Sequence, residues 1–251
     1  MQAGRPRPAC FGIMIDTALL TAGAAALGLA PGEKETEQFA ALADRLTEAN
    51  KQFNLTAITD PDRIVTEHFL DSLTALKAGS PRGKDALDLG TGAGFPGLPL
   101  AICCPEARLT LMDATAKKLR YIDDTAAALG LGNVTTLCGR AEELGRQKEY
   151  RERFDVVYAR AVADMTVLCE LALPFVKPGG LFVAQKSADC KSELSGAREH
   201  IGRLGGTVES VPVFNIPMTA ISRSLIVIRK TGPTPGAYPR DYARIKKHPG
   251  R

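Results

Sequence analysis

The stretch of sequence that decides the fold is a glycine-rich turn at residues 87–97, which reads LDLGTGAGFPG. It follows a short apolar run and opens a helical pattern, so we place it at the carboxyl end of a predicted strand. In open α/β sheets, ligands bind outside that end of the strands, and glycines let the backbone approach them closely. The turn is therefore interpreted as a cofactor loop, with an ordinary strand-to-helix turn as the alternative.

The spacing of the glycines distinguishes two classes of cofactor. A dinucleotide site uses G-x-G-x-x-G before a helix aimed at a pyrophosphate, whereas this loop is G-x-G-x-G and continues with Phe95 and Pro96. S-adenosylmethionine (SAM) has no phosphate and is compatible with such a loop. Asp113 ends the next predicted strand, where a carboxylate can accept hydrogen bonds from both ribose hydroxyls. Asp113 does not discriminate, because NAD has the same ribose and because an aspartate there can also cap a helix.

Outward from the loop, short apolar runs alternate with helical patterns. The expected strands are 86–89, 108–112, 134–137, 154–158 and 181–184, and the intervening stretches 115–129 and 164–173 have helical spacing. This alternation predicts a parallel sheet, because parallel neighbours need crossover connections. Two further strand-like runs, 208–214 and 224–228, predict an antiparallel end. The predicted fold class is α/β, a doubly wound, mostly parallel, seven-stranded, Rossmann-like sheet of the class I SAM methyltransferase type.

The N-terminal part of the chain is predicted to be helical. Apolar residues recur at three- and four-residue steps in 34–53, and Asp60-Pro61 starts a second helix that ends at 79–81. Residues 1–13 are interpreted as a disordered or misassigned extension, with a signal peptide as the alternative, and an amphipathic helix is expected to begin near Met14. The predicted segments are 1–13, a helical segment 14–80, a methyltransferase core 81–230 and a basic, flexible tail 231–251.

Charge and composition limit the possible partners. The 251-residue chain has a net charge of only +4, but residues 223–251 hold eight basic residues and one acid, a net +7 that leaves −3 elsewhere. Such a segment suits RNA phosphate, with a solvated disordered tail as the alternative. The six cysteines show no C-x-x-C pair or zinc-like spacing, so we expect no metal and a reducing compartment. No long apolar run predicts a membrane span.

Two absent motifs narrow the chemistry. Methylation of an exocyclic amine usually employs an N/D-P-P-Y/F turn after the fourth strand, and here residues 158–161 read YARA. Methylation of a pyrimidine carbon requires a cysteine nucleophile, generally from a Pro-Cys pair, which this sequence lacks. A purine ring nitrogen such as guanine N7 has a free lone pair, so placement and electrostatic stabilisation suffice for its methylation.

Cations are expected at the same sheet edge as the cofactor loop. Arg160 follows the fourth strand and Lys186 follows the fifth, which suits an anionic partner such as RNA phosphate. An ion pair of Arg160 with Asp155 or Asp164, and a solvated surface position for Lys186, are the alternatives.

In the helical segment, His68, Asp71 and Ser72 have i, i+3, i+4 spacing and share one helix face. They either face the cleft or form hydrogen bonds at a helix interface.

With these motifs assembled, the sequence resembles the ribosomal RNA small subunit methyltransferase G family, whose members transfer a methyl group from SAM to guanine N7 in 16S rRNA. The resemblance covers roughly 14–230, with a looser match in the tail. It rests on FNLT at 53–56, EHFLDS at 67–72, the glycine loop, DAT at 113–115 before KK at 117–118, RAE at 140–142 and ARA at 159–161. The loop ending in Phe-Pro-Gly together with Ala-Arg-Ala is a specific combination that generic methyltransferases lack.

The resemblance implies a set of roles. SAM contacts are expected from Gly90, Gly92, Phe95, Asp113, Ala114, Thr115, Ala141, Glu142 and Arg160. The cleft beside the cofactor is expected to be lined by Asn54, His68, Asp71 and Ser72, none of them a certain catalytic group. RNA contacts are expected from Arg160, Lys186, Arg229, Lys230, Arg240, Lys246 and Lys247. The expected product is S-adenosylhomocysteine, the substrate 16S rRNA or the small ribosomal subunit at guanine 527, and the enzyme a cytoplasmic monomer.

Three other functions stay open at this point. The first is a SAM methyltransferase acting on another RNA, a protein or a small metabolite, and the basic tail and the lack of a lid segment favour RNA. The second is an RNA-binding module with a structural SAM site. The third, an NAD oxidoreductase, depends only on Asp113.

Overall fold

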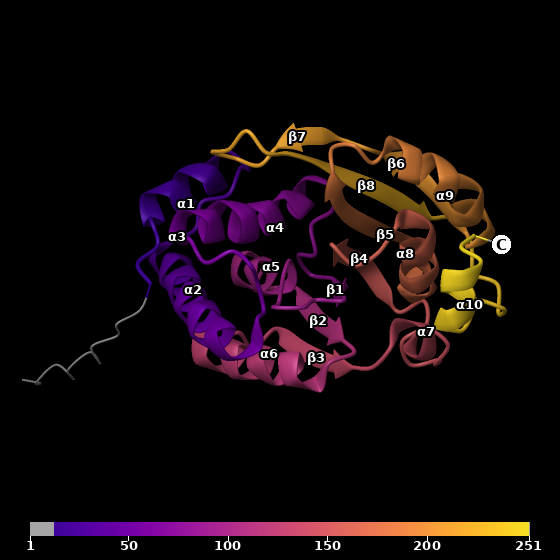
Figure 1. Ribbon diagram of the computed structural model, residues 1–251, viewed down its shortest axis with the longest axis horizontal. Helices are drawn as coiled ribbons and strands as arrows, with labels where there is room; N and C mark the ends of the chain where they lie inside the picture. The colour runs from indigo at the N-terminus through magenta and orange to yellow at the C-terminus, as the bar shows by residue number, and fades with distance from the viewer. Residues whose placement is uncertain (1–12, 251) are drawn as a thin grey trace, which may run out of the picture.

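A mostly parallel β-sheet forms the centre of the protein in the computed structural model, which describes residues 13–250 (Figure 1). Residues 1–12 of the predicted N-terminal extension lie outside the described residues. The strands are β1 (Asp85–Leu89), β2 (Arg108–Asp113), β3 (Val134–Cys138), β4 (Phe154–Arg160), β5 (Val176–Ser187), β6 (Gly206–Ser210), β7 (Val213–Asn215) and β8 (Ser222–Lys230). They pair in the order β3-β2-β1-β4-β5-β8-β6, and β7 also pairs with β8.

The first five strands are parallel, and β8 runs antiparallel to β5, β6 and β7. The predicted fold class is confirmed, and so is the antiparallel end. The expected strand at 208–214 is two strands in the structure, because the chain bulges at Ser210 and then reaches Pro212, which has no N–H to donate to a ladder. The pairing path therefore has seven strands, and the short β7 is an addition.

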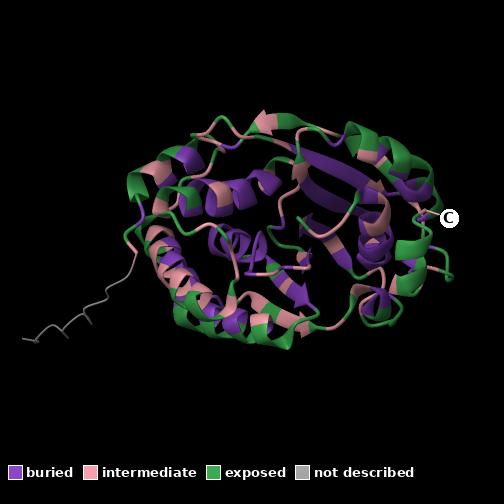
Figure 2. Cartoon of the chain, in the orientation of Figure 1, coloured by how far each residue is buried: buried purple, intermediate pink, exposed green. Residues whose placement is uncertain are grey.

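Successive residues of each strand belong to two separate cores, because side chains alternate between the faces of a sheet. Ala86 packs with the N-terminal helices, α5 (Gly97–Cys103) and α6 (Ala116–Leu129), whereas Leu87 packs with α8 (Met165–Ala172) and α9 (Lys191–Arg203). Figure 2 shows the resulting buried layers on both sides of the sheet. Covering of both faces is what a parallel sheet requires.

The N-terminal segment is helical, as predicted. Helix α1 (Thr17–Ala25) begins where Asp16 accepts the N–H groups of Ala18 and Leu19, and α2 (Glu33–Phe53) follows. A continuous helical run then comprises α3 (Pro61–Arg63), a π-helical stretch η1 (Ile64–Leu70), α4 (Asp71–Leu73) and a 3₁₀ turn η2 (Thr74–Lys77). Asp60 caps this run by accepting the N–H of Arg63 at 2.9 Å. The π-helical stretch carries Glu67 and His68, which contact Arg160 at the end of β4, and such turns often occur at functional sites.

The C-terminal segment differs from the predicted flexible tail. It packs against α8 and ends in α10 (Tyr242–Lys247), whose Ile245 is fully buried. Arg151 donates to the carbonyl oxygens of Thr234 and Tyr238 at 2.6 and 2.8 Å. Composition suggested a solvated tail because proline and glycine were expected to prevent a helix there. That expectation is wrong for 242–247, which are helical, and a cation of the core binds the backbone carbonyls before them.

Within residues 13–250, no helix is long and apolar enough to cross a bilayer, and no group of three or more His, Cys, Asp or Glu side chains is placed to hold a metal. All five cysteines in this range are free, and only Cys138 of them is exposed.

Candidate active site

The glycine loop between β1 and α5 keeps its backbone open toward the carboxyl edge of the sheet. Gly90, Gly92 and Gly94 all have positive φ angles, of 71°, 60° and 92°, which glycine adopts without steric cost. A Cβ atom built on Gly92 would meet nothing nearer than 4.0 Å, so conformation and not packing requires this glycine. The space above it is available to a ligand.

The side chain of Asp88, in β1, fixes the glycine loop through hydrogen bonds. Its Oδ2 accepts the Thr91 hydroxyl at 2.6 Å and the Gly97 N–H at 2.8 Å. Complete burial raises the pKa of this carboxyl to about 6. Its Oδ1 is buried and has no hydrogen-bond partner among residues 13–250. An ammonium group is a donor that would satisfy this oxygen, and the amino-acid end of SAM carries one.

Asp113 at the end of β2 ties the loop to the start of α6. Its Oδ2 accepts the N–H of Gly92 at 3.1 Å and its Oδ1 accepts the N–H of Thr115 at 2.8 Å. Lys118 Nζ lies 3.5 Å from the same Oδ2, and each carboxylate oxygen can accept more than one hydrogen bond. The residue therefore has the capping contact that the sequence left open and also retains acceptors for a ribose diol.

A hollow of about 160 Å³ begins beside Asp113. It brings together five residues predicted to contact the cofactor, which are Gly90, Asp113, Ala114, Ala141 and Glu142. Ala141 and Glu142 come from α7 (Ala141–Leu144), and Glu142 accepts the Arg140 Nε–H at 2.6 Å. The residues present fit SAM. The open glycine turn, an acceptor on Asp88 and acceptors for the ribose hydroxyls on Asp113 all lie at the carboxyl ends of neighbouring strands.

A second hollow, of about 330 Å³, lies at the ends of β4 and β5. Arg160 and Ala161 line it at the end of β4, and Val162, two residues beyond Arg160, lines the first hollow. Ala161 has a φ of 56°, a left-handed conformation that alanine rarely adopts. The strained turn after β4 thus separates a hollow suited to the cofactor from a hollow rich in cations.

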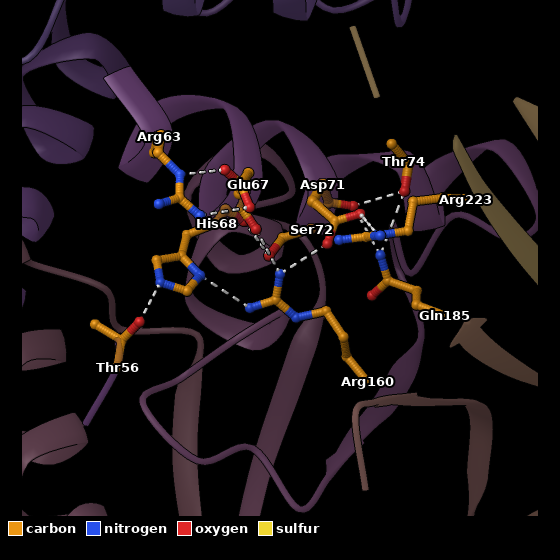
Figure 3. A network of polar contacts seen from close by, with 10 residues as sticks. All are labelled: Thr56, Arg63, Glu67, His68, Asp71, Ser72, Thr74, Arg160, Gln185 and Arg223. Atoms are coloured by element: carbon orange, nitrogen blue, oxygen red, sulfur yellow. Dashed lines mark hydrogen bonds and ion pairs between the residues drawn. The ribbon is translucent and has the colours of Figure 1, made fainter. Parts of the chain in front are cut away.

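Asp71 lines this second hollow and belongs to the network of polar contacts drawn in Figure 3. Its side chain is only 4% exposed, and it pairs with Arg160 Nη1 at 3.0 Å and with Arg223 Nε at 3.3 Å. Arg160 also donates to the carbonyl oxygen of Glu67 at 3.0 Å. Gln185 fixes the helix from the other side by donating to the Asp71 carbonyl at 2.7 Å. One carboxylate therefore joins the helical segment, β4 and the start of β8, and leaves the cluster with a net charge of +1.

His68 is a neutral, structural part of the same network. Its ring stacks on Phe95 with centroids 4.6 Å apart, and its Nε2 and Nδ1 lie 2.8 Å from Thr56 Oγ1 and 3.4 Å from Arg160 Nη2. Because Arg160 can only donate, Nδ1 is the acceptor and Nε2 carries the proton. Burial, reinforced by the charge of Arg160, lowers the pKa of His68 to about 3. The imidazole has no free nitrogen for general-base work.

Comparison with known proteins gives the same result as the motifs. Residues 35–225 match the family model for rRNA small subunit methyltransferase G. The ribosomal RNA small subunit methyltransferase G of Deinococcus radiodurans is 50% identical over 88% of this chain and 88% of that protein, and that of Lactobacillus johnsonii is 43% identical over 88% and 94%. This chain belongs to the rRNA small subunit methyltransferase G family. The predicted family, enzyme class and SAM cofactor are confirmed.

Similar solved structures show the fold alone. The structure of TrmN from Thermus thermophilus has a TM-score of 0.50 and 20% identity, covering 66% of this chain and 53% of that one. A branched-chain polyamine synthase mutein from Thermus thermophilus has a TM-score of 0.53 and 14% identity, covering 78% and 65%.

Several predicted site residues of this methyltransferase are placed away from the hollows. Asn54 is exposed and ends α2 with a φ of 48°, a left-handed position that asparagine tolerates. Ser72 is fully buried and donates to the carbonyl oxygen of His68 at 2.5 Å, so its hydroxyl serves the helix. Phe95 is buried against His68, and Thr115 serves through its backbone N–H. Of the four cleft candidates, His68 and Asp71 reach the cleft.

Besides Arg160, four of the cations predicted to bind RNA are already engaged by the protein itself. Lys186 pairs with Glu193 and donates to the Ala163 carbonyl. Arg229 makes two hydrogen bonds to Glu209 at 2.7 and 3.1 Å, Lys230 is fully buried beside Glu152, and Arg240 binds Glu170. Because β8 runs antiparallel to β5, Arg229 and Lys230 lie at the edge opposite the cofactor. Lys246 and Lys247 remain exposed.

Three residues of the site were missed by the sequence reasoning. Arg223 pairs in register with Ser187, the last residue of β5, so the start of β8 meets the ligand edge. The antiparallel hairpin predicted from sequence contained that signal, because such a strand must begin where its partner ends. Thr56 belongs to the motif 53–56, but its contact with His68 depends on the loop conformation. Tyr242 lines the cofactor hollow from the tail, and no sequence signal placed it there.

Proposed function

We propose that this methyltransferase modifies N7 of a guanine in 16S rRNA, with guanine 527 of the small subunit as the target expected from its family. The observation that carries the proposal is the Arg160–Asp71–Arg223 cluster beside the cofactor hollow. Its net charge of +1 matches one RNA phosphate, and arginine presents a fork of donors to phosphate oxygens. The cluster would hold the target nucleotide with its base toward the cofactor.

The cofactor is proposed to lie along Gly90, Gly92, Asp113, Ala114, Ala141 and Glu142. When bound, SAM supplies an electrophilic methyl group on a sulfonium. Asp113 would accept the ribose hydroxyls, and the glycine turn would let the amino-acid end approach Asp88. Arg160 is proposed to position substrate and not to bind SAM, because it lines the second hollow and not the cofactor hollow.

The state of the side chains supports a target atom that needs no deprotonation. His68 is neutral with both nitrogens engaged, and Asp71 is paired with two arginines. Neither is available to remove a proton from an exocyclic amine. Guanine N7 already has a lone pair, so orientation and a fixed electrostatic environment are the contributions that this cleft can make.

We propose that three of the predicted segments of the chain contribute to different parts of the site. The helical segment 14–80 and the core 81–230 would form the cleft together, and the exposed Lys246 and Lys247 of the tail would add contacts to the RNA backbone. Phosphate contacts of this kind give affinity without sequence choice. We propose that the enzyme acts as a monomer in the cytoplasm, where its ribosomal substrate is found.

The test is to incubate the enzyme with methyl-labelled SAM and either small subunits or naked 16S rRNA, and to map the modified base. We expect label at N7 of one guanine, read as strand scission after borohydride and aniline treatment. A 16S transcript with adenine at nucleotide 527 is the matched control and should accept no label there. Label on ribosomal protein, or on an exocyclic amine, would refute the proposal.

A further inference from the structure

We infer that Tyr242 of the C-terminal tail forms an aromatic wall of the adenine end of the cofactor site, so that the tail takes part in cofactor binding. This rests on the cofactor placement proposed above. Tyr242 lines the same hollow as Gly90, Asp113 and Glu142, although it is 100 or more residues distant from each of them in sequence. The match to the family model ends at residue 225 and does not include it.

The direction of the cofactor follows from the two hollows. The methyl group must face the hollow lined by Arg160 and Ala161, because the nucleotide is proposed to bind there. The ribose is proposed to lie at Asp113. The base must then point away from Arg160, toward the part of the first hollow formed by Ala141, Leu171 and Tyr242. These are apolar or aromatic surfaces, which suit the flat face of a purine.

The Tyr242 ring is held before any ligand arrives. The Arg140 guanidinium lies 4.8 Å from the ring centroid, and its Nε donates to Glu142 in the floor of the hollow. The Lys246 ammonium lies 5.9 Å from the same ring. These cation–π contacts restrict the rotamer of the ring. The ring and Glu142 are thus linked through a single arginine.

The backbone that carries Tyr242 is equally well fixed. Ile245, one turn further along α10, is fully buried in the core beside α8. Arg240 makes hydrogen bonds to both carboxylate oxygens of the buried Glu170, at 2.8 and 2.6 Å, and His200 contacts the same carboxylate at 3.0 Å. Figure 1 shows α10 beside α7 and α8 at the end of the sheet. Such prior ordering means that stacking by Tyr242 costs little further entropy.

The first measurement is the affinity for S-adenosylhomocysteine, determined by calorimetry on the full chain. Tyr242→Ala should raise the Kd about tenfold, because base–aromatic stacking is lost. Tyr242→Phe should remain within about twofold of the parent. Arg244→Ala is the matched control, since Arg244 is exposed on the same helix and does not line the hollow, and its Kd should equal that of the parent. A folded Tyr242→Ala variant with unchanged Kd would overturn the inference.

A second measurement does not depend on removal of the ring. The chain contains no tryptophan, so Tyr242→Trp introduces a single reporter at the predicted wall. Its fluorescence should be quenched by S-adenosylhomocysteine and unaffected by homocysteine, which has no adenine. Arg244→Trp should not respond to either ligand. An unchanged Tyr242→Trp signal at saturating S-adenosylhomocysteine contradicts the inference, whereas failure to methylate guanine N7 would leave both binding results intact and would reject only the RNA target.

Discussion

The two ends of strand β8 carry the same kind of side chain and do opposite things. At its start, Arg223 is 28% exposed and joins Asp71 at the edge of the cationic hollow. At its end, Lys230 is fully buried and donates to Glu152, to Thr234 and to two backbone carbonyls. The strand is nine residues long. Its start lies beside the carboxyl end of β5 and its end lies beside the opposite end of that strand. The function of a basic residue therefore depends on which end of the parallel strands it lies at. The net charge of the chain does not contain this information.

The largest effect on stability and activity is expected for a substitution in the cleft, where Arg223 and Arg160 share Asp71. Arg160→Ala leaves Asp71 buried with only Arg223, so we expect a loss of about 3 to 5 kcal/mol in the free energy of unfolding and a drop of about 100-fold in kcat/KM for rRNA methylation. Urea unfolding and methyl-transfer kinetics measure the two. Arg229→Ala is the control, because its ion pair with Glu209 is exposed and lies at the opposite edge. Equal methylation by both variants would refute a special role for the cleft cations.

The second-largest effect is expected on stability, for a substitution of Lys230 at the C-terminal end of β8. Lys230→Met keeps the length of the side chain but removes every hydrogen bond of its ammonium, so the free energy of unfolding should fall by about 3 kcal/mol. The salt dependence of RNA binding should be the same as in the parent chain. A reduced salt slope in a folded Lys230→Met variant would mean that this lysine contacts phosphate after all.

A pH effect should distinguish the buried cleft from the rest of the molecule. The pKa of His68 falls from 6.5 to about 3 on folding, so the unfolded chain binds a proton between these values and the folded chain does not. Stability is then lost as the pH falls through this window, and between pH 7 and pH 5 this residue alone should account for about 2 kcal/mol. The measurement is urea unfolding at both pH values for the parent and for His68→Gln. If the two chains lose the same amount, His68 is not held neutral.

The smallest effect is expected on the outside of the tail. Replacing both Lys246 and Lys247 with alanine should lower the slope of log affinity for RNA against log salt by about 1 to 2, with unchanged stability. Filter binding at several salt concentrations gives this slope. The single variant Arg229→Ala should not alter it, and identical slopes for all three proteins would show that the tail does not contact RNA.

Patterns in the sequence predicted the parts of this fold that depend on interactions between residues close together in the chain. The glycine loop, the five parallel strands and the start of the helix at Asp60 follow from spacing and from turn chemistry, and each overlaps its expected position, although β5 is longer than the predicted 181–184. Asp113 also followed from its position after a strand. These features depend on residues within a few positions of one another.

The remaining features depend on partners far away in sequence. The burial of Lys230 requires Glu152 and the Thr234 loop, and the ordered tail requires Glu170 to receive Arg240. Neither carboxylate has any sequence pattern that marks it as a partner. Arg160 was predicted at the cleft, but it pairs with Asp71 instead of Asp155 or Asp164, because the helical run places the Glu67 carbonyl and the Asp71 carboxylate within reach of its guanidinium.

The bridge that Asp71 makes to Arg160 and Arg223 also sets an order of events during biosynthesis. Its three members are contributed by residues 71, 160 and 223, so the last of them is translated long after the first. Until then the carboxylate has one cationic partner, and the central sheet lacks the strand that joins β5 to β6. An enzyme whose proposed substrate is ribosomal RNA thus completes its cleft only after the start of β8 has been translated.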